Sequence, residues 1–265
     1  MLPSENRKTQ MKISNAIKNH NRRRQEHNRR RQESKQKTNK SISICYTVRN
    51  RTNLQSKYGP LKLLKNSINS VVKASVGINF EIVISDWRST DTNYSWIPKT
   101  AKLIRIDKDK FSAGYGRNIS AKNARYNNLL FLDADMLIDS KFLRRCFEYL
   151  SVGEIYFPHM WCVSEKDKDK SESFLGKRKP WNNDRTTNTY TDHFKSGWCM
   201  GAGNCCTTKN QWNGAGKWPE YTSWGLEDTH FRRALQKRYK VVREKDDGLI
   251  HQWHPSSRSA WGKKT

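Results

Sequence analysis

The sequence predicts an α/β fold with a doubly wound, mixed β-sheet that helices cover on both faces. Short apolar runs rich in β-branched residues alternate with longer segments whose apolar residues recur at helical spacing. Acidic or basic residues follow directly after several of these runs, as they do where parallel strands end beside a ligand. No stretch approaches the roughly 18 apolar residues of a membrane span. The length of 265 residues allows one large α/β domain or two small ones, and no transmembrane segment is expected.

We expect the first 40 residues to be a basic tail, either disordered or a solvated helix. They hold 13 of the 51 lysine and arginine residues but only 3 of the 25 acidic ones, and the chain carries +26 overall. The segment HNRRRQE occurs at 20–26 and again at 27–33, without an apolar residue to bury. Such a tail either touches RNA or anionic lipid or has no specific partner.

From Ser41 onward the elements can be assigned in order. Apolar runs predict strands at 41–51, 81–87, 101–106, 129–133, 155–163 and 240–244. Helical spacing predicts a helix that begins near Pro60, with Leu61, Leu64, Ile68, Val71 and Val72 on its buried face. Further helices are expected after a glycine-led turn within 114–127, after a cap at Ser140, and at 224–238.

Two segments after residue 150 do not follow the alternation. Residues 164–193 are polar and are expected to form a lid or binding loop. Residues 197–206, GWCMGAGNCC, are expected to cross the sheet. The six cysteines show no C-x-x-C spacing, which predicts free thiols in a reducing compartment and leaves one disulfide open. With no apolar signal-peptide core at the N-terminus, a cytoplasmic protein is expected.

The segment FLDADMLI, residues 131–138, carries the strongest chemical signal. Asp133 and Asp135 end an apolar run, and a one-residue spacer in an extended chain places both carboxylates on one side. Such a pair can hold Mg²⁺ or Mn²⁺. The alternative is a charged strand end before a helix capped by Asp139 or Ser140.

Other polar clusters stand at expected strand ends or helix starts: Arg49–Arg51, Asp86–Asp91, Glu227 with Asp228, and His251 with His254. In order, TVRNR, EIVISDWRSTD, GRNISAKNA, FLDADM, WGLEDTHFRR and IHQWHP resemble a GT-A glycosyltransferase of the family-2 type. The later part is similar to the C-terminal region of galactosyltransferases. The resemblance covers residues 41–258. It implies a GT-A domain at 41–265, with a nucleotide-sugar half at 41–139 and an acceptor and catalytic half at 140–265.

The resemblance implies a role for each residue at the donor site. Asp86 would bind the base or ribose of the nucleotide, and Arg117 would approach its diphosphate. The residues expected to line the nucleotide pocket are Val48, Arg49 and Arg51.

It also implies a metal ion, manganese or else magnesium. Asp135 would ligate the metal directly, and Asp133 would meet the metal or the ribose. His251 or His254 would supply a second protein ligand, with His251 preferred because it follows Leu249 and Ile250 and can leave a strand end.

The catalytic residues implied lie at the start of the helix at 224–238. Asp228 would act as the general base and Glu227 would bind a sugar hydroxyl. Trp224 would offer a flat apolar face to a sugar ring, and Gly225 would let the backbone approach it. A single base implies inversion at the anomeric carbon.

The expected function is metal-dependent transfer of a hexose or N-acetylhexosamine from a UDP-sugar to a glycan, lipid or protein acceptor. The basic tail would hold the enzyme at an anionic membrane surface. The alternative is a nucleic-acid- or anionic-surface-binding protein that acts through residues 1–40, with an inactive body. A metal-dependent nuclease or phosphodiesterase would need more carboxylates or histidines for a two-metal site.

Overall fold

The computed structural model describes residues 40–179, 196–199, 203–223 and 225–255, and the structural statements below concern these residues. The chain divides between Lys40 and Ser41 into two units, and every described residue except Lys40 belongs to the second. The expected tail therefore lies, apart from Lys40, outside the described residues.

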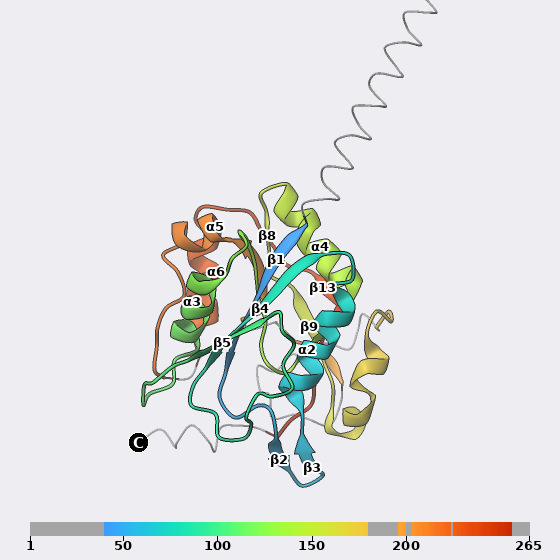
Figure 1. The fold of residues 1–265 in the computed structure, drawn as a ribbon. Coiled ribbons are helices and arrows are strands. Elements are labelled where there is room, and N and C mark those ends of the chain that lie inside the picture. Colours follow the sequence, from blue (N-terminus) through green and yellow to red (C-terminus); the bar gives the residue numbers. More distant parts are fainter. Residues whose placement is uncertain (1–39, 180–195, 200–202, 224, 256–265) are drawn as a thin grey trace, which may run out of the picture. The chain divides into compact units, whose positions relative to one another are not determined.

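A mixed sheet of seven strands forms the centre of the unit, in the order β12-β8-β11-β6-β1-β4-β5 (Figure 1). Its strands are β1 (Ser41–Val48), β4 (Asn79–Asp86), β5 (Ala101–Arg105), β6 (Asn128–Phe131), β8 (Ile155–Tyr156), β11 (Cys205–Thr208) and β12 (Val241–Val242). Strand β1 pairs in parallel with β4 and β6, whereas β11 runs antiparallel to β6 and β8. Ile42, Ile44 and Cys45 of β1 are fully buried, as in a strand covered on both faces. The mixed α/β sheet predicted from the sequence is confirmed.

Helices cover both faces of this sheet (Figure 1). On one face, α2 (Leu63–Ala74) and α4 (Ser140–Ser151) contribute Leu64, Ile68 and Phe142 to the larger apolar core. On the other face, α3 (Ala113–Asn123), α5 (Lys209–Gly214) and α6 (Glu227–Gln236) pack around Trp212 and Phe231. The doubly wound arrangement follows because each helix buries one apolar stripe against the sheet.

A second sheet of four strands has the order β10-β9-β13-β7. Its strands are β7 (Met136–Ile138), β9 (His159–Cys162), β10 (Gly197–Cys199) and β13 (Lys245–His251). The single strand expected at 155–163 is wrong: β8 and β9 belong to different sheets, and Pro158 between them has no N–H to continue a ladder. Strand β7 was not expected, whereas β13 ends at His251, as expected when His251 was taken to leave a strand end after Leu249 and Ile250.

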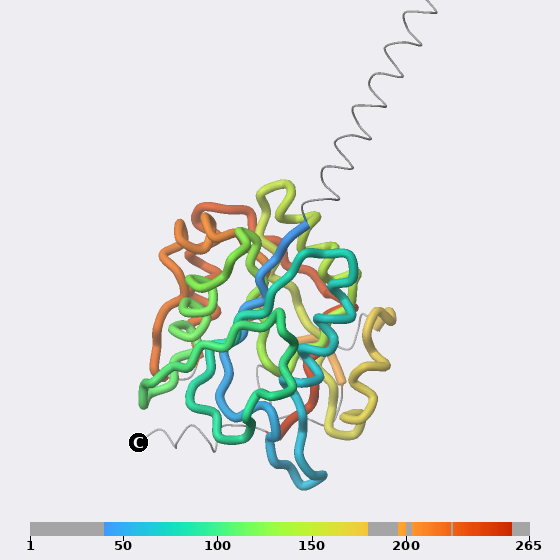
Figure 2. The backbone as a smooth tube through the Cα atoms, in the orientation of Figure 1, coloured from blue at the N-terminus to red at the C-terminus, as the bar shows by residue number. Residues whose placement is uncertain are grey.

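Details of two expected helices also differ from the structure. Pro60 lies in β3 (Gly59–Leu61), which pairs with β2 (Leu54–Ser56) in a hairpin that projects at the lower end of Figure 1 and Figure 2, and α2 begins only at Leu63. Val72 is 39% exposed and so does not belong to the buried face of α2. Of the two caps expected for α4, Asp139 and Ser140, the structure has Asp139, whose Oδ1 accepts a hydrogen bond from the Phe142 amide at 2.8 Å.

The glycine-led turn expected within 114–127 is instead part of α3, which begins after the cap residue Ser112. A Cβ on Gly116 would overlap the side chain of Thr47, and one on Gly114 would overlap the Pro219 carbonyl. These glycines therefore allow α3 to lie close to β1 and to the chain before α6.

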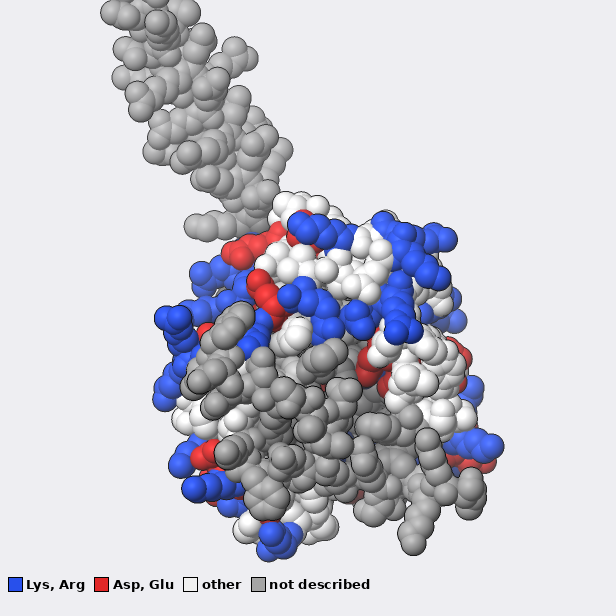
Figure 3. All heavy atoms as spheres, turned by 180° about the vertical axis from the view of Figure 1, so that it is seen from behind, with Lys and Arg blue, Asp and Glu red and all other residues white. Residues whose placement is uncertain are grey.

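The segment at 164–179 begins with the 3₁₀ helix η1 (Glu165–Phe174), and the remainder of the expected loop, 180–193, lies outside the described residues. Lysine and arginine side chains gather along the upper part of the face in Figure 3. Within the part of the chain that is described, no helix is both long and apolar enough to cross a membrane.

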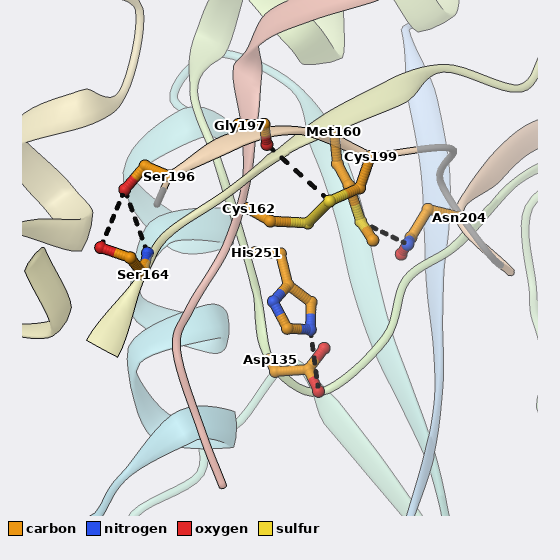
Figure 4. The surroundings of a disulfide bond; sticks show 9 residues. All are labelled: Asp135, Met160, Cys162, Ser164, Ser196, Gly197, Cys199, Asn204 and His251. Carbon is orange, nitrogen blue, oxygen red and sulfur yellow. Dashed lines mark hydrogen bonds and ion pairs between the residues drawn. A yellow bond between two sulfur atoms is a disulfide. The ribbon is translucent and has the colours of Figure 1, made fainter. Parts of the chain in front are cut away.

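The sequence predicted free thiols but left one disulfide open, and the described residues contain one. Cys162 of β9 and Cys199 of β10 form a disulfide (Figure 4). Antiparallel pairing of these strands brings their Cα atoms to 6.1 Å, although 37 positions separate them in the sequence. The other four, Cys45, Cys146, Cys205 and Cys206, are free and buried.

Candidate active site

The D-x-D segment lies in a turn between β6 and β7, at the edge where the two sheets meet. The Met136 amide donates to the Asp133 carbonyl at 3.1 Å, which closes the turn. The expected extended geometry, with both carboxylates on one side, is therefore wrong. Asp133 and Asp135 face two different groups of side chains, and the turn joins these groups.

The first group consists of Asp135, His251 and His254. One potential ligand atom from each residue lies within 4.8 Å of the others. Oδ2 of Asp135 is 3.1 Å from Nε2 of His254 and 3.8 Å from Nε2 of His251. All three side chains are between 11 and 13% exposed. Asp133, predicted as a metal or ribose contact, is not part of this group.

Backbone pairing fixes the position of both histidines. His251 is the last residue of β13 and lies opposite Met136 of β7 on one side and Cys162 of β9 on the other, so that it points at Asp135 (Figure 4). The amide of Gln252 donates to the Asp135 carbonyl at 2.9 Å and ties the following segment to the turn. Nδ1 of His254 lies 2.9 Å from the Pro255 carbonyl, which only accepts, so this nitrogen carries the proton. Nε2 of His254 lies within hydrogen-bond distance of Asp135, 3.1 Å from its Oδ2.

The electrostatics of Asp135 follow from these neighbours. Burial alone would raise its pKa, but the two histidines and Arg51 hold the pKa of Asp135 well below its ordinary value. A carboxylate that stays ionised beside two imidazoles is a donor set for a divalent transition metal.

The second group gathers around Arg117 of α3, whose side chain is 6% exposed. Its guanidinium donates to Asp133 Oδ1 at 2.8 Å and to Asp228 Oδ1 at 2.9 Å, and it lies 3.7 Å from Glu227 Oε1. The same guanidinium lies 4.5 Å from the ring centre of Trp218. Residues from the turn, α3 and α6 thus meet at one cation.

Three carboxylates around one cation leave a net negative charge in a buried site. Burial raises the pKa of Asp228, Arg117 opposes this, and Glu227 and Asp133 add to it, with the result that the pKa of Asp228 is about 7. The pKa of Asp133 is also raised, mainly by burial. Asp228 can therefore accept and release a proton near neutral pH.

The start of α6 holds a second acceptor. Oε2 of Glu227 is buried and has no hydrogen-bond partner among the described residues. Gly225 and Leu226 both have positive φ, +89° and +73°, and so turn the chain sharply into the helix. Trp224, predicted to face a sugar ring, lies outside the described residues.

The residues expected at the nucleotide lie at the carboxyl ends of β1 and β4. Asp86 is fully buried and accepts hydrogen bonds from the hydroxyl of Tyr94 at 2.6 Å and from the guanidinium of Arg105. Val48 is buried opposite it, Arg49 is exposed, and Arg51 is close enough to Asp135 to lower the pKa of that carboxyl.

Sequence reasoning did not single out Asn204. This fully buried side chain accepts from the Asp133 amide at 2.9 Å and donates to Asp133 Oδ2 at 3.2 Å. Gly203 beside it has φ +68°, and a Cβ there would overlap the Arg117 guanidinium. The sequence signal that could have indicated Asn204 is its position as a polar residue between Gly203 and the apolar start of β11.

A sequence profile described as Glycosyl transferase family 2 matches residues 43–206. The chain belongs to this family. Chondroitin sulfate synthase 3 from Homo sapiens is 26% identical to this glycosyltransferase over 166 residues, which are 60% of this chain and 18% of that protein. The mouse protein is 25% identical over 60% of this chain and 17% of its own length. The chain thus spans about a fifth of these relatives.

The fold of this glycosyltransferase is similar to crystal structures of S. aureus TarS 1-349. The complex with UDP-GlcNAc has a TM-score of 0.56 and 15% identity over 84% of this chain and 62% of that one. The structure in complex with UDP has a TM-score of 0.54 and 16% identity over 81% and 61%. At this identity the likeness shows the GT-A fold that the sequence resemblance implied.

Proposed function

We propose that this glycosyltransferase moves a hexose or N-acetylhexosamine from a UDP-sugar to an acceptor hydroxyl, with inversion at the anomeric carbon. The observation that carries the proposal is the D-x-D turn. Asp135 on this turn forms a possible metal site with two histidines, and Asp133 on the same turn shares Arg117 with Asp228, whose pKa is about 7. The similar fold of a TarS crystal form that contains UDP-GlcNAc supports a UDP-sugar donor.

Asp135, His251 and His254 fit a divalent metal, because one carboxylate oxygen and two imidazole nitrogens lie within 4.8 Å of each other. The imidazoles favour Mn²⁺ over Mg²⁺, which prefers oxygen ligands. A bound divalent ion would offset the negative charge that develops on the leaving diphosphate.

Asp228 is the proposed general base. It takes the proton of the acceptor hydroxyl while that oxygen attacks the anomeric carbon. Arg117 holds the Asp228 carboxylate in place by the 2.9 Å hydrogen bond, and Oε2 of Glu227, which has no partner among the described residues, accepts from a sugar hydroxyl. One base and one displacement give an inverted product.

The nucleotide is assigned to the edge formed by the ends of β1 and β4. Val48, Arg49 and Arg51 would line this pocket, and Asp86 would face the base or ribose. Asp133 would meet the ribose. Arg117 would approach the diphosphate while it holds the carboxylates.

The test is UDP release from a panel of UDP-sugars, with Mn²⁺ and with a chelator. We expect UDP release from one of the donors. This release should require Mn²⁺ and should be lost in Asp135→Ala and in Asp228→Asn. Asp109→Asn is the matched control, because this carboxylate is 92% exposed and pairs with Arg88. The proposal would be rejected if no UDP-sugar in the panel released UDP and calorimetry detected no UDP binding. A product that retains the anomeric configuration by NMR would reject inversion.

A further inference from the structure

A cavity of about 630 Å³ opens beside the proposed donor site. It lies between the chain that follows β1, the first turn of α2 and the loop between β4 and β5. Its size is within the range of pockets that bind small molecules. None of the residues assigned above to the donor, the metal or the base lines it.

Two residues that line this cavity each hold a buried oxygen atom without a hydrogen-bond partner among the described residues. These atoms are Oγ1 of Thr52, a residue only 4% exposed, and Oδ1 of Asp91. The other Asp91 oxygen accepts from the backbone amides of Thr52 and Asn53 at 2.7 and 2.8 Å, so the carboxylate is held in one orientation. Buried polar atoms of this kind are normally satisfied, which indicates a ligand with hydroxyl groups.

The remaining walls narrow the chemistry of that ligand. Trp96 stacks on Tyr94 at 6.3 Å, and its indole N–H is already bonded to Thr92 at 3.0 Å, so it contributes mainly apolar surface. A carboxylate, a hydroxyl and an aromatic face together suit a sugar ring. Lys62 and Lys65 also line the cavity and form no ion pair with any described residue, which favours an anionic substituent on that ring.

Residues that line the cavity are next to residues of the proposed donor site. Thr52 directly follows Arg51, whose charge acts on Asp135. The ring that stacks on Trp96 belongs to Tyr94, whose hydroxyl donates to Asp86. A saccharide here would therefore lie beside the donor site without occupying it.

We infer that this cavity is an acceptor subsite for a saccharide unit that carries a carboxylate, sulfate or phosphate group. The inference rests on the proposed function, because it names the acceptor class of that reaction. Asp91 and Thr52 bind ring hydroxyls, Trp96 covers the apolar side of the ring, and Lys62 and Lys65 bind the anionic group.

The test uses ligand-observed NMR on the full chain with four probes. These are methyl glucuronide, methyl glucoside 6-sulfate, methyl glucoside 6-phosphate and neutral methyl glucoside. At least one anionic glycoside should bind about tenfold more tightly than the neutral one, the change expected for a charge-assisted contact. Saturating UDP should leave it bound, and inorganic sulfate alone should not displace it.

Two variants assign the binding to the cavity. The double change Lys62→Gln and Lys65→Gln should weaken the anionic glycoside about tenfold. Lys73→Gln, on the same helix but outside the cavity, should not. Thr52→Val keeps the shape of the side chain and should weaken binding without lowering Tm, because Oγ1 has no internal partner among the described residues to lose.

Several results would overturn the inference. They are no binding of any anionic glycoside, displacement by UDP, displacement by sulfate alone, equal effects of the lysine variants and the control, or a clear fall of Tm in Thr52→Val. UDP binding and Mn²⁺-dependent UDP release are measured on the same protein. If they persist while the glycosides fail to bind, the acceptor subsite is rejected and the proposed function stands. If they are absent, the proposed function itself is rejected.

Discussion

Arg117 shows how a single buried side chain determines the properties of its neighbours. Its guanidinium contacts Asp133 and Asp228 and lies near Glu227, and it is almost fully buried. One positive charge cannot balance three carboxylates in a site from which water is largely excluded. Asp228 therefore has a pKa of about 7, whereas Asp135, which faces two imidazoles and Arg51, stays ionised. Asp228 and Asp135 thus differ in how readily they take up a proton near neutral pH.

The first prediction concerns the pH dependence of catalysis. Asp228 accepts a proton only when it is deprotonated, so kcat/KM should be constant above its pKa of about 7 and fall tenfold per pH unit below it. Asp228→Asn should lower kcat by about 10² to 10⁴-fold and remove this limb of the profile. The measurement is UDP release between pH 5 and 9, with UDP binding followed over the same range as the control. A limb that persists in Asp228→Asn would assign it to another group.

At the scale of elements, Gly203 and Asn204, which directly precede β11, hold Arg117 and Asp133 in position. Asn204 accepts from the Asp133 amide and donates to its carboxylate, and Gly203 packs directly against the Arg117 guanidinium. These two residues thus determine where Arg117 and Asp133 lie, although neither is assigned to catalysis.

The second prediction tests this contact. Gly203→Ala should lower UDP release strongly, because the new methyl group would displace the Arg117 guanidinium that holds Asp228. Gly153→Ala is the matched control: Gly153 also has positive φ, +76°, but a Cβ there meets nothing within 4 Å. Both variants should lose about 1 to 2 kcal/mol of stability from the left-handed backbone, whereas only Gly203→Ala should lose activity. Equal activities of the two variants would contradict the prediction.

The third prediction concerns the strand pair β9 and β10. The disulfide Cys162–Cys199 closes a loop with a sequence separation of 37 beside His251, which pairs with Cys162. Changing both cysteines to serine should lower the free energy of unfolding by about 3 to 4 kcal/mol, the loop-closure value for this length.

The measurement is denaturant unfolding with and without dithiothreitol. Reductant should destabilise the wild type by a similar amount and leave the double variant unchanged, because the other four cysteines are free. A wild type that is insensitive to reductant under denaturing conditions would contradict the assignment of the disulfide.

At the scale of the whole molecule, the dominant property is positive charge. The chain carries +26, and the basic residues on the face shown in Figure 3 belong to the glycosyltransferase unit, so the tail does not account for all of it. Residues 1–39 lie outside the described residues, and their contact with an anionic membrane or nucleic acid stays a prediction.

The fourth prediction is that the full chain floats with vesicles containing phosphatidylserine and that removal of residues 1–40 weakens this binding. Each lysine or arginine near such a surface contributes about 1 kcal/mol at low salt. Binding should fall steeply as ionic strength rises, since the Debye length shortens. Neutral phosphatidylcholine vesicles are the control. Flotation that the truncation leaves unchanged would rule out a membrane role for the tail.

Much of the larger sheet was predictable because its strands are apolar on both faces. The runs around Ile44, Val83 and Leu130 have no other stable place than the centre of a sheet, and the helices between them carry clear apolar stripes. The second sheet was largely missed because its strands lack such apolar runs. Strand β13 begins Lys245–Asp246–Asp247, and β7 follows a turn after only four residues, so neither carries the pattern of a buried strand.

The sequence alone determined the fold class, the family and the residue types of the candidate site, since these depend on local composition and on the order of motifs such as FLDADM and IHQWHP. Only the tertiary structure decided which groups meet. The turn at Asp133–Ala134–Asp135 separates the two carboxylates, β13 carries His251 to one of them, and α3 carries Arg117 to the other. Contacts such as Cys162 with Cys199, or Asn204 with Asp133, join residues 37 and 71 positions apart. Local periodicity cannot contain them, because they exist only once the strands have paired.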